Sequence, residues 1–456
     1  MKRLAQRLRS NFSSEKSRLN INNMNQTVLT ADYAIRGSIL VKAKEIQKEI
    51  ESGSSDYNFD MITECNIGNP QIFGQKPISF SRNVLACLTN PDIMDSFPFH
   101  KDVINRAKLY REINKISIGA YSDSLGYEGL RKRIASALEK RDGFPANPNH
   151  IMMTAGASNG ISLIMQAMLN SPKDGIMIPI PQYPFYLAAI KLNRGAPVPY
   201  FLNENDGWQI TVEDLEKSLE KSKAEGVNVK AIVLINPGNP TGQILKKETM
   251  KGIVEFCQRN SIVILADEVY QQNIYKEGAQ FHSFKKVICE SSGEEKNVQL
   301  ISFHSTSKGI VGECGFRGGY MEALNIDSKV WEQMVKLKSI FICSNTPGQY
   351  VSDLMMNPPS LEDCTQETVE KYNQEYNSIF ESLKSRAANV TEMLNQMKNI
   401  ESNEIEGAMY AFPRLILGDK AIAAAKESNL APDAFYCFKG ILYFSLTQLS
   451  RKQESF

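Results

Sequence analysis

The chain has 456 residues, of which 42% are hydrophobic and 23% are charged, an ordinary composition for a globular protein. Its 52 Lys and Arg against 51 Asp and Glu give a formal net charge of +1, which argues against a broad nucleic-acid-binding surface. No apolar stretch reaches the roughly 20 residues of a spanning helix, so we expect no membrane segment. Eight scattered cysteines without a C-x-x-C pair, and four distant histidines, argue against a disulfide framework or a metal site.

The first twenty residues differ from the rest of the chain. They contain six basic residues, one acidic residue and four serines, and therefore carry a net charge of +5. Leu4, Leu8 and Phe12 form one apolar stripe if the segment is helical. Such a composition is typical of mitochondrial transit peptides. We therefore expect residues 1–27 to direct the protein to the mitochondrial matrix; a disordered basic arm on a cytoplasmic protein is the alternative.

From about residue 31, helical patterns alternate with short apolar runs. The runs predict buried strands at 150–154, 175–180, 231–235, 262–266 and 300–303. Strands this apolar are typical of a parallel sheet that is covered on both faces. Apolar periodicity also predicts a helix after residue 156 and a long helix between about 369 and 398. The sequence thus predicts an α/β fold with a mostly parallel sheet flanked by helices.

Small and polar residues follow two of these strands. Ligands of open α/β sheets bind outside the carboxyl ends of the strands. Gly156, Ala157 and Ser158 begin the helix after the first strand, where free backbone N–H groups and the helix dipole favour a phosphate. The loop NPGNPTG (236–242) follows the strand 231–235 and holds Asn239 on a backbone made rigid by prolines. A turn that serves only packing is the alternative reading of both features.

Charged residues follow two further strands. Asp267 comes directly after the strand 262–266 and needs a partner, because an unpaired buried charge is costly; a helix N-cap is the alternative. Lys308 follows the strand 300–303 after small hydroxyl residues, and Arg317 lies nine residues further on. This spacing indicates an amine held in a crowded anion-binding site.

The motifs GAS (156–158), NPGNPTG (236–242), ADEVY (266–270) and STSKGIVGECGFRGG (305–319), taken in order, resemble those of the fold type I pyridoxal-phosphate aminotransferases. Further stretches are similar to the alanine aminotransferase family: 28–50, 66–80, 120–135 and 180–186. The resemblance covers roughly residues 28–439. It implies amino transfer between L-alanine and 2-oxoglutarate, giving pyruvate and L-glutamate, by a homodimer with pyridoxal 5′-phosphate. A related transaminase, such as one using glyoxylate, or a lyase on the same fold is the alternative.

The resemblance also implies roles for individual residues at the reacting end of the cofactor. Lys308 would bond to the cofactor aldehyde and move the substrate α-proton, and Asp267 would keep the pyridine nitrogen protonated. Tyr270 and Asn239 would donate hydrogen bonds to the phenolic oxygen of the ring. Gly68 and Asn239 would lie against the substrate, although a glycine there also fits a plain turn.

Other residues would bind the phosphate and the ring face. The resemblance assigns the phosphate to Arg317, Ser305, Gly156, Ala157 and Ser158. Tyr183 would stack on the ring, with a merely packed aromatic as the alternative. Tyr121 would reach the phosphate of the neighbouring subunit, or is an ordinary loop tyrosine. His304 is expected to be a structural neighbour of the site and not a base.

The expected domain organisation is discontinuous. A large cofactor-binding domain is expected at 106–355, and a smaller α+β domain would combine residues 28–105 with 356–456.

The alanine aminotransferase family continues beyond the equivalent of residue 439 through further strands, a final helix and an arginine that binds the substrate α-carboxylate. Residues 440–456 do not resemble that stretch, so we expect retained cofactor affinity with reduced alanine turnover. A cofactor-binding protein with impaired catalysis is the corresponding alternative.

Overall fold

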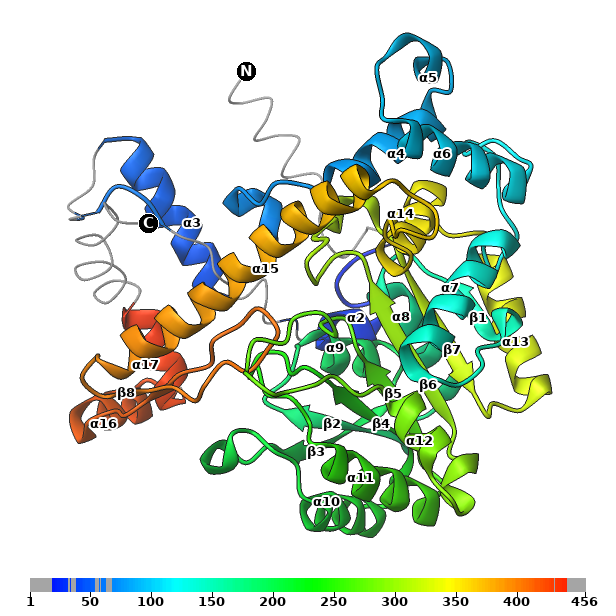
Figure 1. Cartoon of the computed structure of the whole chain (residues 1–456). Helices are drawn as coiled ribbons and strands as arrows, with labels where there is room; N and C mark the ends of the chain where they lie inside the picture. The colour runs from blue at the N-terminus through cyan, green and yellow to red at the C-terminus, as the bar shows by residue number, and fades with distance from the viewer. Residues whose placement is uncertain are drawn as a thin grey trace.

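The computed structural model describes residues 19–31, 33, 38–53, 57, 59–62, 68–429 and 431–440. Its centre is a seven-stranded sheet with the order β1-β7-β6-β5-β4-β2-β3 (Figure 1). The strands are β1 (Ile151–Met153), β2 (Asp174–Ile180), β3 (Ala196–Phe201), β4 (Asn228–Ile235), β5 (Val263–Asp267), β6 (Leu300–Ser305) and β7 (Gly319–Leu324). Only β7 runs antiparallel to its neighbours in this sheet. The mostly parallel α/β architecture predicted from the sequence is therefore confirmed.

Both faces of the sheet are covered by helices. In chain order, the helices of the described residues are α2 (Gln26–Thr30), α3 (Ser38–Glu51), α4 (Ser79–Thr89), α5 (Ile93–Ser96), α6 (Lys101–Asn114), α7 (Glu128–Asp142), α8 (Ala157–Met168), α9 (Phe185–Leu192), α10 (Val212–Ala224), α11 (Lys247–Asn260), α12 (Phe284–Glu290), α13 (Ser328–Ile340), α14 (Thr346–Met356), α15 (Gln366–Asn395), α16 (Asp419–Glu427) and α17 (Pro432–Gly440). Short 3-10 turns are η2 (Pro70–Phe73), η3 (Pro148–His150), η4 (Glu204–Asp206), η5 (Glu294–Asn297) and η6 (Cys314–Phe316).

The central strands are mostly apolar because each contributes to two cores. Along β4, Ile232 and Leu234 join the core under α10, α11 and α12, whereas Ala231 and Val233 join the core under α8, α9 and α13. Side chains alternate between the faces of a strand, so both faces need apolar residues when helices cover both. β4 pairs with β5 from Ala231 opposite Val263 to Ile235 opposite Asp267, so the two strands end at the same place.

The five strands expected from apolar runs are all present, with ends shifted by three residues or fewer. β3 and β7 are additional. β3 lies at the sheet edge and contains two prolines, which lowers its strand signal, and β7 contains the buried Glu322, which pairs with Lys285 at 2.6 Å. The long helix spans Gln366–Asn395, close to the expected range.

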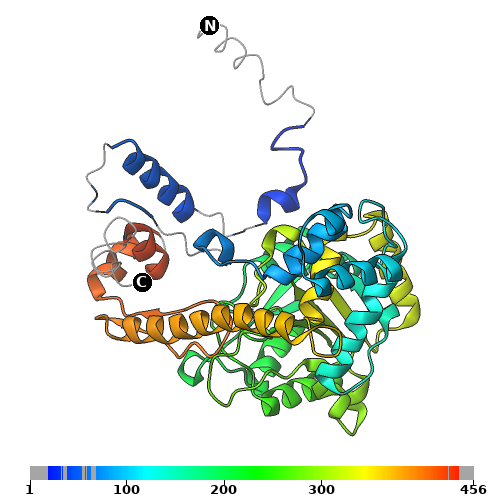
Figure 2. The same ribbon diagram turned by 45° about the horizontal axis from the view of Figure 1, so that its top comes forward.

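The 30-residue helix α15 leads away from the large sheet (Figures 1 and 2). It ends beside a second, two-stranded sheet formed by β8 (Ile400–Glu401) and β9 (Arg414–Leu415), with α16 and α17 beyond. A helix with the length and apolarity that a bilayer crossing demands is not found in the part of the chain that the structure describes. The seven cysteines among these residues are free thiols.

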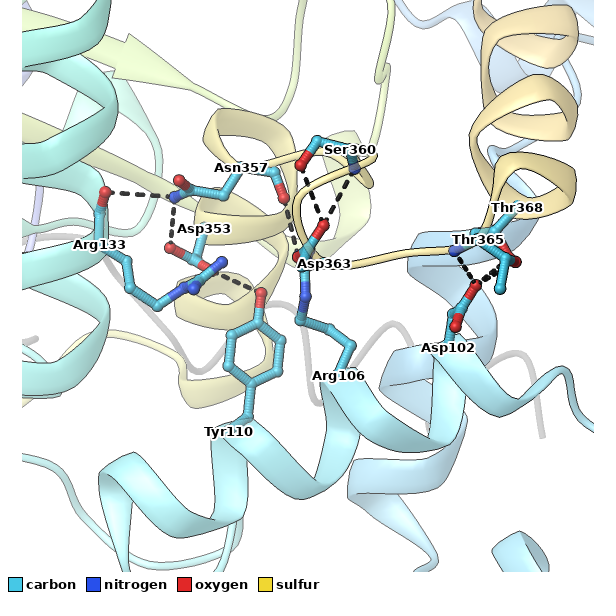
Figure 3. A network of polar contacts seen from close by, with 10 residues as sticks. All are labelled: Asp102, Arg106, Tyr110, Arg133, Asp353, Asn357, Ser360, Asp363, Thr365 and Thr368. Atoms are coloured by element: carbon cyan, nitrogen blue, oxygen red, sulfur yellow. Dashed lines mark hydrogen bonds and ion pairs between the residues drawn. The ribbon is translucent and has the colours of Figure 1, made fainter.

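A polar network anchors the start of α15 (Figure 3). The Asp353 carboxylate on α14 is fully buried and accepts hydrogen bonds from Tyr110 of α6 at 2.5 Å and from Arg133 of α7 at 2.8 Å. Earlier on α6, about one turn before Tyr110, Arg106 pairs with Asp363, and about two turns before it Asp102 accepts from the backbone N–H of Thr365 at 2.8 Å. The network thus fixes the loop between α14 and α15, and with it the direction in which α15 leaves the large sheet.

Asp353→Ala should destabilise the protein strongly. Removing the carboxylate leaves the Arg133 guanidinium and the Tyr110 hydroxyl without their buried partner, and breaking a buried charge pair costs about 3–5 kcal/mol. Urea unfolding of the cofactor-free protein, followed by circular dichroism, measures the free energy of unfolding. Glu362→Ala is the control, because the Glu362–Lys140 pair is solvent-exposed and should contribute less than about 1 kcal/mol. Equal losses in the two variants would contradict this role of the network.

Candidate active site

The carboxyl ends of parallel strands meet at one edge of the sheet. There β4 is followed by the loop 236–242, β5 ends in Asp267, and β6 is followed by the loop that carries Lys308. The backbone N–H of Asn236 donates to the Asp267 carbonyl at 3.0 Å, so a hydrogen bond joins the carboxyl ends of β4 and β5. The sheet therefore brings together chemically active residues that are far apart in the sequence, such as Asp267 and Lys308, which are separated by 41 positions.

Asp267 is buried with one carboxylate oxygen satisfied and the other free. Tyr186 of α9 donates to Oδ2 at 2.7 Å, while Oδ1 has no hydrogen-bond partner within the described residues. Burial raises the pKa of Asp267 to about 6, although the Tyr186 hydroxyl, the Val269 N–H and the Lys308 charge act in the opposite direction. A lone buried acceptor of this kind is costly, and it fits a ligand group that donates one hydrogen bond.

Lys308 is half-buried and lies against the backbone of Gly68. Its Nζ donates to the Gly68 carbonyl at 2.7 Å. A Cβ atom at Gly68 would stand 2.9 Å from the Tyr410 hydroxyl and 3.1 Å from Lys308 Nζ. Glycine at position 68 therefore lets the amine approach the backbone without displacing the Tyr410 hydroxyl.

Arg317 and the start of α8 form a cradle that suits an anion. The Arg317 guanidinium donates to the carbonyl of Ala155 at 2.8 Å and to the hydroxyl of Ser307 at 3.2 Å. A Cβ at Gly156 would stand 2.7 Å from the guanidinium, so only glycine allows this approach. Ser158, on the first turn of α8, lies 3.5 Å from the same group.

The cradle combines charge with free donors. No ion pair neutralises Arg317 within the described residues, and the N–H groups of Ala157 and Ser158, the first two of α8, have no carbonyl a turn earlier in the helix. The next N–H, that of Asn159, donates to the Gly156 carbonyl at 3.2 Å. Ser305 is buried beside the cradle and accepts the Ser307 N–H at 3.1 Å. Arg317 itself has a φ of +50°, an unfavourable backbone conformation for an arginine that favours a functional reason for its placement.

Several tyrosines surround these groups. Tyr270 is buried, and its hydroxyl donates to that of Tyr410 at 2.9 Å. Burial and the neighbouring Tyr410 raise the pKa of Tyr270, which keeps this phenol protonated. Tyr183 is half-buried; its ring stacks on Phe185 at 5.8 Å between centroids and its hydroxyl lies 3.4 Å from that of Tyr33.

Two expected site residues make no side-chain contact with this group. Tyr121 is 76% exposed, and no hydrogen bond or ring contact of its side chain occurs within the described residues. Asn239 is half-buried in the loop 236–242, also without a side-chain hydrogen bond to any described residue.

His304 is buried with both ring nitrogens unpartnered among the described residues, and burial lowers its pKa to about 3, so it stays neutral. The expectations for residues 1–18 and 441–456 fall outside the described residues.

Tyr186, Tyr410 and Tyr33 were not identified from the sequence as site residues. Tyr186 lies within the stretch 180–186, and its position one turn after Tyr183 was the available signal. Tyr410 comes 140 residues after its partner Tyr270, and no local pattern marks it.

A cavity of about 680 Å³ opens beside this group of residues. Gly68 and Tyr410 line it on the side of Lys308, and Ile379, Leu383 and Arg386 of α15 line it opposite. No group of three or more His, Cys, Asp or Glu side chains suited to a metal ion lies within the part of the chain that the structure describes. The sheet edge thus offers an amine, a carboxylate and an anion cradle, and a space large enough for small molecules lies beside them behind Gly68 and Tyr410.

Asp267 should make the stability of the cofactor-free protein depend on pH. Its pKa is 3.8 in a solvated chain and about 6 when folded, so the folded protein binds this proton more tightly. The protonated carboxyl therefore stabilises the fold fully below pH of about 4, and this contribution is lost as the pH rises to about 6, by about 3 kcal/mol at most. Urea unfolding at several pH values should show this decline in the wild type relative to Asp267→Asn. A constant difference between the two proteins across that range would contradict the assignment.

Comparisons with known proteins agree with this geometry. The family model of aminotransferase class I and II matches residues 97–415. Alanine aminotransferase 1, mitochondrial, of Arabidopsis thaliana is 46% identical over 430 residues, covering 93% of this chain and 79% of the relative. Glutamate–glyoxylate aminotransferase 2 of the same plant is 42% identical, covering 92% of this chain and 86% of its own. The structure of an alanine aminotransferase from Pyrococcus furiosus is similar with a TM-score of 0.68 and 25% identity, covering 87% of this chain and 85% of that one. This chain therefore belongs to the class I and II aminotransferases, a family of enzymes that depend on pyridoxal phosphate.

Proposed function

We propose that this chain binds pyridoxal 5′-phosphate and transfers the amino group of L-alanine to 2-oxoglutarate, giving pyruvate and L-glutamate. The free Oδ1 of buried Asp267 carries the proposal, because it lies at the same sheet edge as the amine of Lys308 and the charge of Arg317. Relatives named alanine aminotransferases support the amino donor. Glyoxylate as the amino acceptor is the second candidate, since relatives named glutamate–glyoxylate aminotransferases are 42% identical.

The chain has residues suited to the ring nitrogen, the aldehyde and the phosphate of the cofactor. Asp267 Oδ1 would accept the hydrogen bond of the protonated ring nitrogen, and Lys308 would hold the aldehyde carbon covalently. The Arg317 guanidinium, the hydroxyls of Ser305 and Ser158, and the first N–H groups of α8, which begins at Ala157 after its N-cap Gly156, would bind the phosphate. When bound, the pyridinium ring supplies an electron sink for the pair that an amino acid releases when it loses its α-proton.

The residues of the chain would then orient the groups and move the proton. Lys308 Nζ is bonded to the carbonyl of Gly68, which lines the cavity, and would take the substrate α-proton and return it. Asp267 would be held as the carboxylate once Oδ1 gains a cationic N–H partner, since a nearby opposite charge favours the ionised acid. Tyr270 and Asn239 would donate to the ring oxygen, and Tyr183 would cover one face of the ring.

Substrate would enter through the cavity between Tyr410 and α15. Lys76 and Arg386 also line this cavity and provide positive charge that attracts the carboxylates of amino and oxo acids. Gly68 and Asn239 would lie against the substrate. A homodimer is part of the proposal, because the exposed Tyr121 fits a contact with the phosphate of a second copy. We also propose the division into a large domain at 106–355 and a discontinuous small domain of 28–105 and 356–456.

Transaminase activity tests the function directly. After loading with pyridoxal phosphate, the protein should produce pyruvate from L-alanine and 2-oxoglutarate, measured with a coupled lactate dehydrogenase assay. Lys308→Ala should still bind the cofactor through Asp267 and Arg317 but lose at least about 10³-fold in kcat, because no other amine replaces the base. Borohydride reduction should label Lys308 in the wild type.

Faster turnover with glyoxylate than with 2-oxoglutarate would favour the second candidate. Full activity of Lys308→Ala, or a label on another lysine, would exclude the proposed role of this residue.

We further propose that the protein resides in the mitochondrial matrix. The +5 charge of the first twenty residues and a relative named mitochondrial support this address. Residues 1–27 fused to a fluorescent protein should direct it to mitochondria, as seen by microscopy. A fusion in which the basic residues of this segment are replaced by glutamine is the control and should stay in the cytosol. A diffuse signal from the unaltered fusion would indicate a basic arm without a targeting role.

A further inference from the structure

We infer that Tyr410 is a positioning residue, whose hydroxyl donates to that of Tyr270 and so orients Tyr270 toward the ring oxygen of the cofactor. The inference rests on the proposed function, because the oxygen concerned belongs to bound pyridoxal phosphate. Neither the motifs of the sequence nor the comparisons assign a role to Tyr410.

The two phenols meet in a geometry that leaves little freedom. Their hydroxyl oxygens are 2.9 Å apart, and their rings are nearly perpendicular, with centroids separated by 5.8 Å. Tyr270 is 1% exposed and lies in a small apolar cluster with Val269 and Ala408. A buried hydroxyl with a single partner depends on that partner for its orientation.

Tyr410 belongs to a segment that is bonded tightly to the sheet edge. Ala408 N–H donates to the Asn273 carbonyl at 3.1 Å, and the buried Tyr275 hydroxyl donates to the Ala408 carbonyl at 2.6 Å. Gly407 N–H donates to the Gly242 carbonyl at 2.8 Å, which ties the segment to the loop after β4 as well. A Cβ at Gly407 would stand only 2.5 Å from the Asn273 carbonyl, so glycine permits this close packing. The segment thus delivers Tyr410 to the site as a rigid part of it.

The direction of the hydrogen bond between Tyr270 and Tyr410 depends on which phenol donates its proton. Each phenol has one proton, and in this structure Tyr270 donates its proton to Tyr410. If Tyr270 donates to the ring oxygen instead, its own oxygen needs a donor, and Tyr410 is the hydroxyl within reach. The chain Tyr410 to Tyr270 to ring oxygen is then cooperative, since a hydroxyl that accepts a hydrogen bond becomes a better donor.

Several other polar side chains lie near Tyr270. Asp267 and Tyr183 act on Tyr270 electrostatically, and Lys308 Nζ and the Tyr410 hydroxyl are both close to Gly68. Asp267 accepts from Tyr186, and the Tyr183 hydroxyl lies next to that of Tyr33. Neither is hydrogen-bonded to Tyr270 in the structure, which leaves Tyr410 as the hydroxyl partner of Tyr270 within the described residues.

The test is a pH titration of the absorbance of the cofactor bound to the full chain. A hydrogen bond donated to the ring oxygen stabilises its anionic form, so a weaker donor raises the pH midpoint of the spectral change. Tyr410→Phe removes only the hydroxyl and should raise the midpoint by on the order of half a pH unit. Tyr270→Phe should raise it further. Incorporation of 3-fluorotyrosine at position 410, a stronger donor, should lower the midpoint.

Tyr275→Phe is the matched control, because it removes another phenol that holds the same segment but does not contact Tyr270. Its midpoint should equal that of the wild type. A wild-type midpoint in Tyr410→Phe, or an equal shift in Tyr275→Phe, would overturn the inference while leaving the proposed function intact. Failure of the wild-type protein to bind pyridoxal phosphate would overturn both.

Discussion

The organisation of the site depends on one buried carboxylate. Asp267 ends a strand whose other residues are apolar and enclosed by helices on both faces, so water does not solvate its charge. Tyr186 satisfies one oxygen, and the other remains an acceptor without a donor within the described residues. This unpartnered oxygen destabilises the fold until a ligand supplies the missing donor. The architecture of the sheet thereby contributes to the affinity for a protonated ring nitrogen.

The rest of the site follows from where strands end. Parallel neighbours β4, β5 and β6 leave the loop 236–242, Asp267 and the Lys308 loop at the same edge, and the antiparallel β7 begins there, next to Arg317. Gly319, the first residue of β7, lies against Gly156, so the anion cradle is held by backbone contact between two strand ends. The carboxylate is therefore positioned by a strand, and the amine and the guanidinium by the connection between two paired strands, β6 and β7.

The wall of the cavity opposite Lys308 has a different origin. It is formed by α15, whose first half shares a core with α4, α6 and α14 and whose Phe380 ring lies 5.9 Å from that of Tyr275. Asp102, Arg106 and Asp353 fix the loop that precedes this helix (Figure 3). The second half of α15 carries apolar residues that remain partly exposed toward the cavity. The polar network thus decides how far this wall stands from the amine, and the large sheet decides the position of the amine itself.

The sequence was informative where function and fold share a local pattern. Apolar runs identified the central strands, and Asp267, directly after one run, and Lys308, five residues after another, both lie at the carboxyl edge of the sheet. Tyr410 and Tyr33 were missed because they approach the site through contacts across 140 or more residues, which no local spacing encodes. Arg386 was not foreseen in the cavity either, since α15 reads as an amphipathic helix and its partner surface is set by the tertiary fold. Tyr121 and Asn239 remain predictions.

The central claim is that Asp267 holds a protonated ring nitrogen, and nitrogen NMR tests it most directly. The protein would be loaded with pyridoxal phosphate labelled with ¹⁵N in the ring, and its spectrum recorded above the pH at which the free cofactor loses this proton. The account predicts the chemical shift of a protonated pyridine nitrogen in the wild type and of an unprotonated one in Asp267→Asn. An unprotonated nitrogen in the wild-type protein would contradict it.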